Sequence, residues 1–315
     1  MKKPLIILTG PTAVGKTSLS IALAKAVNGE IISADSMQVY RHMDIGSAKI
    51  RPEEMHGVPH HLVDCLEPDE EFNVVRFQQM AKEAMEGIYA RGRIPVLVGG
   101  TGFYIQAVTG DIDFTVHGED TTYRRMLEEK AKTEGAQVLH EMLVAVDPAS
   151  AEAIHANNVK RVIRALEYYQ QTGKPISQHN EEQRQKESPY NLAYFVLNDD
   201  RSRLYERIDA RIDQMLDEGL IDEVKALKEM GYHKGMVSMQ GLGYKEILSY
   251  LDGTWSLEEA VYVLKRDTRH FAKRQITWFK RERQVEWFDK QEFGYDSQAI
   301  LDAMLASLRE KKIIE

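Results

Sequence analysis

The residues whose types and spacing could most clearly do chemistry are Gly10-Pro11-Thr12-Ala13-Val14-Gly15-Lys16-Thr17. They follow an apolar run at 5–8 and precede a helical pattern at 18–27. This is the arrangement of a phosphate-binding loop, in which backbone N–H groups and a helix N-terminus face an anion. We expect Lys16 to reach the outer phosphates and the Thr17 hydroxyl to ligate Mg²⁺. The loop alone leaves open whether the phosphate belongs to ATP, GTP or another diphosphate.

A carboxylate follows the next predicted strand. The apolar segment at 30–34 ends at Asp35, and strand, loop, helix and strand at this spacing form a βαβ unit with parallel strands. Ligands gather at the carboxyl ends of parallel strands, so Asp35 is expected on the same edge of the sheet as the phosphate loop. Its carboxylate could act on a substrate or could cap the next element, and the sequence leaves both open.

The strand predicted at 94–98 ends in Gly99-Gly100-Thr101. An ordinary phosphate-loop NTPase commonly has an acid here that holds Mg²⁺ or a water. The glycines allow the backbone to approach a ligand closely, and the Thr101 hydroxyl can donate a hydrogen bond without adding charge. A tight turn is the alternative. The missing acid argues against a standard ATPase.

Arginines on a helix predicted at 201–218 could add positive charge to the site. Arg203, Arg207 and Arg211 recur every four residues and therefore share one face. They could bind a diphosphate if that face meets the phosphate loop. Acidic residues on the same helix offer ion pairs as the alternative: Glu206, Asp209 and Asp213.

The elements that must position these residues indicate an α/β protein. The chain of 315 residues is long enough for a large core with a second module. We expect a P-loop NTPase-like core, a parallel sheet flanked by helices, from 1–112 and 191–315, with its last third helical. A helical insertion is expected at 113–190, with the polar run at 177–187 as a solvated linker.

Composition limits the class of protein and its partners. Cys65 is the only cysteine, so no intramolecular disulfide can form, and no segment is long and apolar enough for a membrane helix. We expect a cytoplasmic monomer. Histidines near Cys65 are expected to make hydrogen bonds in an irregular segment at 38–68 and not to bind a metal.

The charge distribution bears on nucleic-acid binding. The formal net charge of −8 argues mildly against a nucleic-acid partner. Residues 261–283 depart from this average, because the segment contains eight basic residues and only two acidic ones, with aromatic residues among them. Such a segment suits contact with nucleic acid, while a charged helix with an aromatic core face is the alternative.

Motifs along the chain together resemble those of the tRNA dimethylallyltransferase family, also called tRNA isopentenyltransferases. The resemblance covers nearly the whole chain and is closest to the bacterial form, which has no zinc-finger extension. Besides the phosphate loop, the motifs are Ala34-Asp35-Ser36-Met37-Gln38-Val39-Tyr40, Met43–Lys49, Pro59–Asp64, Val98–Tyr104, Val159–Glu167, Arg207–Met215, Gly241-Leu242-Gly243-Tyr244 and Ala272–Trp278.

This resemblance implies transfer of a dimethylallyl group from dimethylallyl diphosphate to the exocyclic N6 amine of the adenosine 3′-adjacent to the anticodon, with Mg²⁺. Asp35 would accept the amine proton and Thr101 would donate to the bridging oxygen. The phosphate loop, with Arg207 and Arg211, would bind the diphosphate, and Thr17 the metal. Residues expected to contact the anticodon stem-loop of tRNA are Asp35, Ser36, Met37, Gln38, Thr101, Arg124, Lys160, Arg161, Val162, Ile163, Arg164, Gln240, Gly241, Leu242, Gly243 and Tyr244.

Other functions remain possible at this point. An adenylate isopentenyltransferase would run the same chemistry on a free nucleotide, but the insertion and the basic segment favour a polymeric acceptor. A small-molecule P-loop kinase would use the same loop for ATP, with Asp35 activating a hydroxyl. An RNA-binding module with a structural nucleotide would leave Asp35 and Thr101 without a role.

Overall fold

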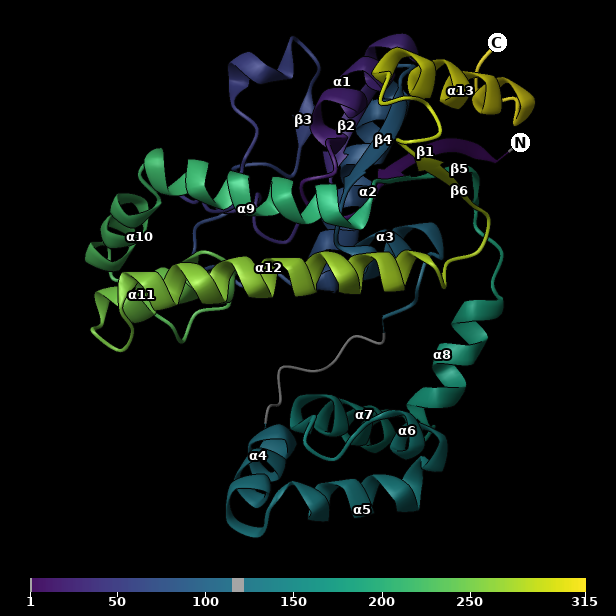
Figure 1. Cartoon of the computed structure of the whole chain (residues 1–315). Coiled ribbons are helices and arrows are strands. Elements are labelled where there is room, and N and C mark those ends of the chain that lie inside the picture. The colour runs from purple at the N-terminus through teal and green to yellow at the C-terminus, as the bar shows by residue number, and fades with distance from the viewer. Residues whose placement is uncertain (1, 115–121) are drawn as a thin grey trace. The chain divides into compact units, whose positions relative to one another are not determined.

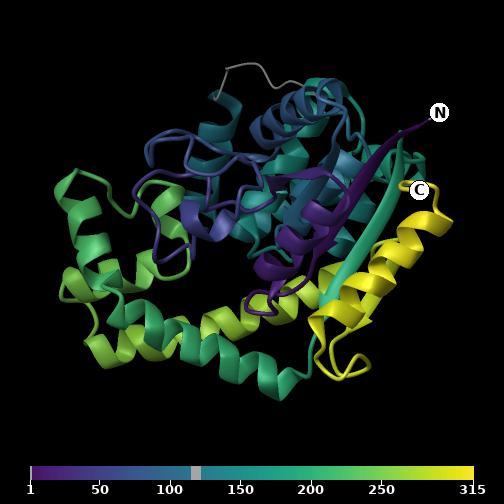
Figure 2. The ribbon, with the colours of Figure 1, turned by 90° about the horizontal axis from the view of Figure 1, so that it is seen from above.

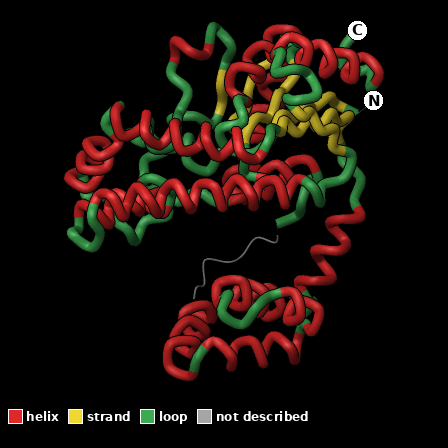
Figure 3. The backbone as a smooth tube through the Cα atoms, in the orientation of Figure 1, coloured by secondary structure: helices red, strands yellow, loops and turns green. Residues whose placement is uncertain are grey.

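The computed structural model describes residues 2–114 and 122–315, which form two compact units. Unit 1 comprises Met1–Thr109 and Ser188–Glu315, and unit 2 comprises Gly110–Glu187. The chain therefore divides at 109/110 and 187/188, where the sequence suggested 112/113 and 190/191. Strands occur only in unit 1 among the described residues, as Figure 3 shows by colour.

Unit 1 is built on a parallel sheet, which confirms the expected α/β class. The strand order is β3-β2-β4-β1-β5-β6, and every neighbouring pair is parallel. The strands are β1 (Lys3–Thr9), β2 (Gly29–Ser33), β3 (His60–His61), β4 (Ile94–Gly99), β5 (Tyr190–Asn198) and β6 (Val285–Asp289).

The centre of the sheet is the core of unit 1. β1 lies between β4 and β5, with Ile6 paired to Val96 on one side and to Ala193 on the other. Its residues 5–8 are fully buried. Burial on both faces explains their continuous apolar run, which is typical of an inner parallel strand. The carboxyl ends of all these strands share one edge.

Helices of unit 1 flank the sheet (Figure 1). α9 and α12 run side by side in the two views, and α10 and α11 connect their far ends (Figures 1 and 2). The helices are α1 (Lys16–Ala26), η1 (Pro52–Met55), α2 (Val74–Ala90), α3 (Gly102–Thr109), α9 (Arg201–Asp217), α10 (Leu220–Glu229), η2 (Ser238–Gln240), α11 (Tyr244–Leu251), α12 (Leu257–Phe279) and α13 (Ser297–Glu310).

Unit 2 is a helical bundle with its own apolar core, in which Leu139, Leu143 and Val162 are fully buried. The Asp147 carboxylate accepts hydrogen bonds from the backbone and hydroxyl groups of Ser150 and Ser177, and so ties together two of the helices. The helices are α4 (Thr122–Glu134), α5 (Ala136–Val146), α6 (Pro148–Ala153), α7 (Val159–Thr172) and α8 (Ile176–Gln185).

Two expectations about secondary structure are wrong. The polar run at 177–187 is mostly helix α8, because its Glu and Gln residues favour helix and pair one turn apart, as in the 3.1 Å bond from Gln178 Nε2 to Glu182 Oε1. The last third of the chain is not all helical, because β6 adds an edge strand beside β5. Five residues are too few for periodicity to distinguish a strand from a loop.

Candidate active site

The phosphate loop leaves β1 and enters α1 at the carboxyl edge of the sheet. Gly10 has a φ of +143°, and a Cβ there would lie 2.2 Å from the Leu197 carbonyl oxygen of neighbouring β5. Gly15 has a φ of +100° and immediately precedes α1. Both positions therefore require glycine, for conformation and, at Gly10, for close packing against the next strand.

A cavity of about 510 Å³ opens over this loop. Its walls come from the phosphate loop, from the segments that follow β2 and β4, and from α9 and α12. Lys16, Thr17, Asp35, Arg207 and Arg211 all line it. The topology thus brings together, within unit 1, a lysine, two arginines, a hydroxyl and a carboxylate from distant parts of the sequence.

The charges in this cavity act on one another. Burial and repulsion from Arg211 lower the pKa of Lys16 to about 7, while the Asp35 carboxylate opposes that change. Burial also lowers the pKa of Arg211, again against the effect of Asp35. The Lys16 ammonium donates to the carbonyl oxygens of Gly10 and Pro11, at 2.9 and 2.8 Å. Such a crowded positive centre is suited to a multiply charged anion.

The arginines of α9 have different partners. Arg207 Nε donates to the Ala13 carbonyl oxygen at 2.8 Å, and the Arg203 guanidinium lies 3.9 Å from the centre of the Tyr295 ring. Arg211 has no hydrogen bond or ion pair within the described part of the chain, although it is half-buried in the cavity wall. Its guanidinium therefore remains available to a ligand.

Asp209 and Asp213 do not neutralise these arginines. Asp209 pairs with Arg269 at 2.6 Å, and Asp213 pairs with Lys265 at 2.6 Å, so both acids connect α9 to α12. The sequence left open that these two acids form ion pairs with the arginines of the same helix, and for both acids that alternative is wrong. These two ion pairs help to fix the orientation of α9 against α12.

Asp35 caps the turn after β2 and also lines the cavity. Oδ1 accepts from the backbone N–H groups of Met37, at 2.8 Å, and Gln38, at 3.3 Å, which caps the turn after β2. Oδ2 makes no hydrogen bond within the described residues, and the side chain lines the cavity. One oxygen holds the carboxylate in place while the other faces the site.

Thr101 begins the turn into α3. Its N–H donates to the Ala34 carbonyl oxygen at 3.2 Å, beside Asp35, and its own carbonyl accepts from Tyr104 and Ile105. Its side chain is not in the wall of the cavity, whereas Gly99 and Gly100 are. A hydrogen bond from the Thr101 hydroxyl to a bound diphosphate thus stays a prediction.

The glycines around Thr101 pack against protein. A Cβ at Gly99 would lie 2.2 Å from the Ala34 carbonyl oxygen, one at Gly100 2.1 Å from Gln275 Nε2, and one at Gly102 2.3 Å from Trp278 Cδ1. The sequence suggested close approach to a ligand or a tight turn. The closest approaches are instead to Ala34, the residue after β2, and to α12.

Sequence reasoning missed two residues that fix the phosphate loop. The Gln275 side chain, on α12, accepts from Thr12 N–H at 2.9 Å and donates to the Gly100 carbonyl at 3.0 Å, so it joins the two loops. Lys290, which follows β6, donates to the Val14 carbonyl at 3.3 Å. Gln275 lies in the Ala272–Trp278 motif, so its importance could have been predicted from the sequence. Lys290 lies in none of the motifs.

The predicted tRNA contacts in unit 1 have varied surroundings. Ser36 and Met37 are half-buried near the cavity, and Gln38 lines it. Gln240 is exposed and donates to the Lys234 carbonyl. Leu242 is half-buried. Gly241 is in close contact with protein, since its Cβ would lie 2.4 Å from Met37 Cε. Gly243 is buried and is the N-cap of α11.

Tyr244 is fully buried, and its hydroxyl donates to Glu223 Oε1 at 2.9 Å. Burial, reinforced by the Glu223 carboxylate, raises its pKa well above the usual value. This side chain is therefore not presented to a macromolecule at the surface.

In unit 2 the predicted tRNA residues fall into two groups. Lys160 and Arg161, at the start of α7, are exposed, whereas Val162 and Ile163 belong to the apolar core of the unit. Arg124 forms a two-bond ion pair with Glu167, at 2.9 and 2.7 Å. Burial lowers the pKa of Arg164. The exposed cations at the start of α7 are thus the best placed for phosphates.

The basic segment at 261–283 is largely α12. Lys265 and Arg269 are used in ion pairs to α9, but a second cavity, of about 490 Å³, is lined by cationic and aromatic groups. Trp278 within it contacts the Phe103 ring edge-on, with the centroids 6.2 Å apart. The lining residues are His270, Lys273, Arg274, Thr277, Trp278 and Arg281.

The histidines near Cys65 make hydrogen bonds, as expected. His60 Nδ1 lies 2.8 Å from the Val58 carbonyl oxygen, and His61 Nε2 lies 2.7 Å from the buried carboxylate of Glu30. Among the described residues, no group of three His, Cys, Asp or Glu side chains could hold a metal ion. Nor does any described helix combine the length and apolar character needed to span a bilayer.

Comparisons with known families agree with the sequence motifs. A family model described as IPP transferase matches residues 38–282, and one described as isopentenyl transferase matches residues 3–64. The tRNA dimethylallyltransferase of Lachnoclostridium phytofermentans is 66% identical over 99% of this chain and 100% of its own. That of Carboxydothermus hydrogenoformans is 53% identical over 92% of this chain and 93% of its own.

Solved structures give the same result. The tRNA isopentenylpyrophosphate transferase of Bacillus halodurans is 48% identical, with a TM-score of 0.74 over 99% of this chain and 98% of its own. A eukaryotic dimethylallyltransferase acting on tRNA is 32% identical, with a TM-score of 0.79 over 91% of this chain and 74% of its own. The kinase and free-nucleotide alternatives are not favoured.

Proposed function

The chain belongs to the tRNA dimethylallyltransferase family, and from this we propose that it transfers the dimethylallyl group of dimethylallyl diphosphate to N6 of the adenosine 3′-adjacent to the anticodon. One observation carries the proposal within the structure: the phosphate loop, two arginines and a single carboxylate meet in one cavity. This arrangement suits a reaction in which a diphosphate leaves while a nitrogen loses a proton.

The diphosphate would lie against the loop N–H groups, Lys16 and Arg211. Breaking the allylic C–O bond places the bonding electrons on the departing diphosphate, so negative charge grows there in the transition state. Cations and N–H groups fixed beforehand stabilise that charge without reorganising. Arg207, which is bonded to the loop carbonyl of Ala13, adds positive charge beside the same backbone.

Asp35 would orient the acceptor amine. The N6 lone pair is delocalised into the adenine ring, which makes the amine a weak nucleophile. A carboxylate oxygen that accepts a hydrogen bond from the amine both directs it at the allylic carbon and takes up its proton as the new C–N bond forms. Asp35 Oδ2 is suited to this task, since Oδ1 is already bonded to the backbone of the following turn. Thr101 would donate to the bridging oxygen.

The donor set also fits Mg²⁺. The Thr17 hydroxyl lines the cavity and makes no hydrogen bond within the described residues, so it can serve as a ligand. Mg²⁺ is typically bound by one or two protein oxygens together with substrate phosphates and water, and a cage of protein carboxylates is not needed. When bound, the ion would neutralise charge on the diphosphate.

The acceptor would reach this site as part of a tRNA. Extruding the target base from its stack costs a few kcal/mol, which contacts elsewhere must offset. Exposed cations such as Lys160 and Arg161 in unit 2, and the cationic and aromatic lining on α12, are suited to RNA phosphates and bases. Because tRNA is the acceptor, we propose that the protein acts in the cytoplasm. We also propose that it acts as a monomer.

The substitution Asp35→Asn tests the role of the carboxylate. Asn retains the oxygen that accepts from Met37 and Gln38, so the turn should persist while the basic oxygen is lost. With dimethylallyl diphosphate saturating, the single-turnover rate should fall by about 10² or more. Asp217→Asn, at an exposed position on α9, is the matched control. A rate for Asp35→Asn equal to that of the control would reject the proposed role.

A further inference from the structure

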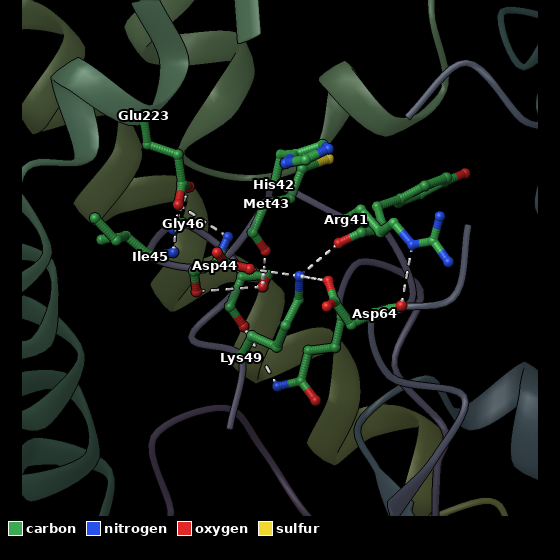
Figure 4. A network of polar contacts seen from close by, with 12 residues as sticks. Arg41, His42, Met43, Asp44, Ile45, Gly46, Lys49, Asp64 and Glu223 are labelled. Carbon is green, nitrogen blue, oxygen red and sulfur yellow. Dashed lines mark hydrogen bonds and ion pairs between the residues drawn. The ribbon is translucent and has the colours of Figure 1, made fainter. Parts of the chain in front are cut away.

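A carboxylate outside the cavity organises one of its walls. Glu223, in the first turn of α10, accepts hydrogen bonds from three consecutive backbone N–H groups: Asp44 and Ile45 donate to Oε2, at 2.9 and 2.7 Å, and Gly46 donates to Oε1 at 3.1 Å. Figure 4 shows the Glu223 side chain directed at this loop. A carboxylate that accepts several such bonds is held more strongly than a neutral acceptor would be.

Tyr244 completes the arrangement from a third segment. Its hydroxyl is the fourth donor to Glu223, through Oε1, and a Cβ at Gly46 would lie 2.6 Å from its ring. The ring therefore covers Gly46 while the hydroxyl fixes the carboxylate. Two sequence motifs that had no role in the chemistry, Met43–Lys49 and Gly241–Tyr244, thus meet at one side chain.

A second set of bonds fixes the opposite side of the same loop. The Lys49 side chain is 6% exposed, and its ammonium donates to the Tyr40 carbonyl at 2.6 Å and to the carboxylates of Asp44 and Asp64, at 2.5 and 2.8 Å (Figure 4). The loop is consequently held between Glu223 and Lys49. Loss of the hydrogen bonds to either side chain would leave residues 44–46 less constrained on that side.

This loop continues into the cavity wall near Asp35. Ser47, the next residue after Gly46, lines the cavity. Gln38 lines it as well, and its amide donates to the carbonyl oxygens of Ser47 and Ala48, at 3.4 and 3.1 Å. The backbone N–H of Gln38 in turn donates to Asp35 Oδ1 at 3.3 Å. An unbroken series of bonds therefore joins Glu223 to the carboxylate proposed to orient the amine.

We propose that Glu223 is a positioning residue for the acceptor side of the site, holding residues 44–46 so that Ser47 and Gln38 keep the wall beside Asp35 in place. This inference rests on the proposed function. In the described part of the chain, the phosphate loop and α9, which form the diphosphate side, make no hydrogen bond to Glu223 or to residues 44–46. The role of Tyr244 is to orient the Glu223 carboxylate and not to touch the tRNA.

The test is Glu223→Gln in the full-length protein. The amide keeps the shape of the side chain but replaces one acceptor oxygen by an NH₂ group. Each Glu223 oxygen accepts from two of the four donors, so the NH₂ group would lie against two N–H or O–H donors. We expect the tRNA kcat/KM to fall by about tenfold, while the Kd of dimethylallyl diphosphate changes by less than about twofold. Glu229→Gln, at the exposed end of the same helix, is the control and should match the wild type.

Two further measurements separate positioning from general stability. Hydrogen–deuterium exchange of the amides at 44–46 should accelerate in Glu223→Gln and not in Glu229→Gln. Tyr244→Phe, which keeps the ring over Gly46, should give a smaller loss, and adding it to Glu223→Gln should cause little more, because the hydroxyl acts through the carboxylate.

The outcomes distinguish this inference from the proposed function. Equal tRNA kcat/KM for Glu223→Gln and Glu229→Gln would refute the role of Glu223 alone. A parallel loss of diphosphate affinity would refute it too, because the side chain would then only support the fold. A wild-type protein that leaves every tRNA unmodified would instead refute the proposed function.

Discussion

The protonation of Lys16 should control diphosphate binding at mildly alkaline pH. Burial and Arg211 lower the pKa of Lys16 to about 7, so its ammonium loses its proton within the accessible range. A bound diphosphate favours the charged form, because an adjacent anion raises the pKa of an ammonium. Binding therefore takes up a proton whenever the pH exceeds 7. It follows that affinity falls as the pH rises.

The size of the effect follows from the fraction of protein already protonated. If Lys16 is charged throughout in the complex, the apparent Kd scales with one plus the ratio of neutral to charged lysine. With a pKa of about 7, this predicts about 25-fold weaker binding at pH 9 than at pH 7.5. The ionisation of a phosphate group, near pH 6, lies below this window, so the charge of the ligand stays constant.

Isothermal titration of dimethylallyl diphosphate at constant free Mg²⁺ measures this dependence. Lys16→Arg should bind with a flat profile between these pH values, because a guanidinium remains charged. Lys25→Met, an exposed position on the same helix, should keep the full slope of the wild type. A wild-type Kd that is constant from pH 7.5 to pH 9 would refute the assignment of the lowered pKa to a phosphate-binding Lys16.

Other substitutions test the packing and the RNA surface. Gly99→Ala should lower the free energy of unfolding by about 3 kcal/mol, because the added Cβ would meet backbone atoms. Gly87→Ala, in a helix with room for the added Cβ, should raise the free energy of unfolding by up to about 1 kcal/mol. Urea titration measures both changes. Gln275→Leu breaks two loop hydrogen bonds and should cost about 2 to 4 kcal/mol in the same assay, and an unchanged midpoint would contradict its bridging role. Removing the charges of Lys160 and Arg161 should reduce the slope of log Kd for tRNA against log salt by about one each, and an unaltered slope would exclude them from phosphate contact.

Local pattern was enough to predict the phosphate loop, the inner strands and most helices. The loop has a fixed spacing of glycines, lysine and hydroxyl, and buried strands such as β1 have continuous apolar runs. The position of Asp35 followed from topology, because parallel strands end at one edge of the sheet. The partners of a side chain were not predictable in this way.

Several of the unpredicted contacts join residues far apart in the sequence. Gln275 bonds to Thr12 across 263 positions, and Glu223 bonds to Asp44 across 179. On α9 the sequence showed which residues share a face, but Asp209 pairs with Arg269 of α12, which periodicity cannot reveal. Burial of Tyr244 was likewise hidden, because an aromatic residue after a glycine-bearing turn is compatible with either core or surface.

We infer that the cavity over the phosphate loop is where a prenyl carbon is joined to an adenosine nitrogen of tRNA. Mass spectrometry of nucleosides from tRNA incubated with the protein, dimethylallyl diphosphate and Mg²⁺ tests it most directly. One adenosine, 3′-adjacent to the anticodon, should gain the mass of a dimethylallyl group with the wild type and far more slowly with Asp35→Asn. Unmodified tRNA, in the presence of protein that binds both substrates, would contradict the account.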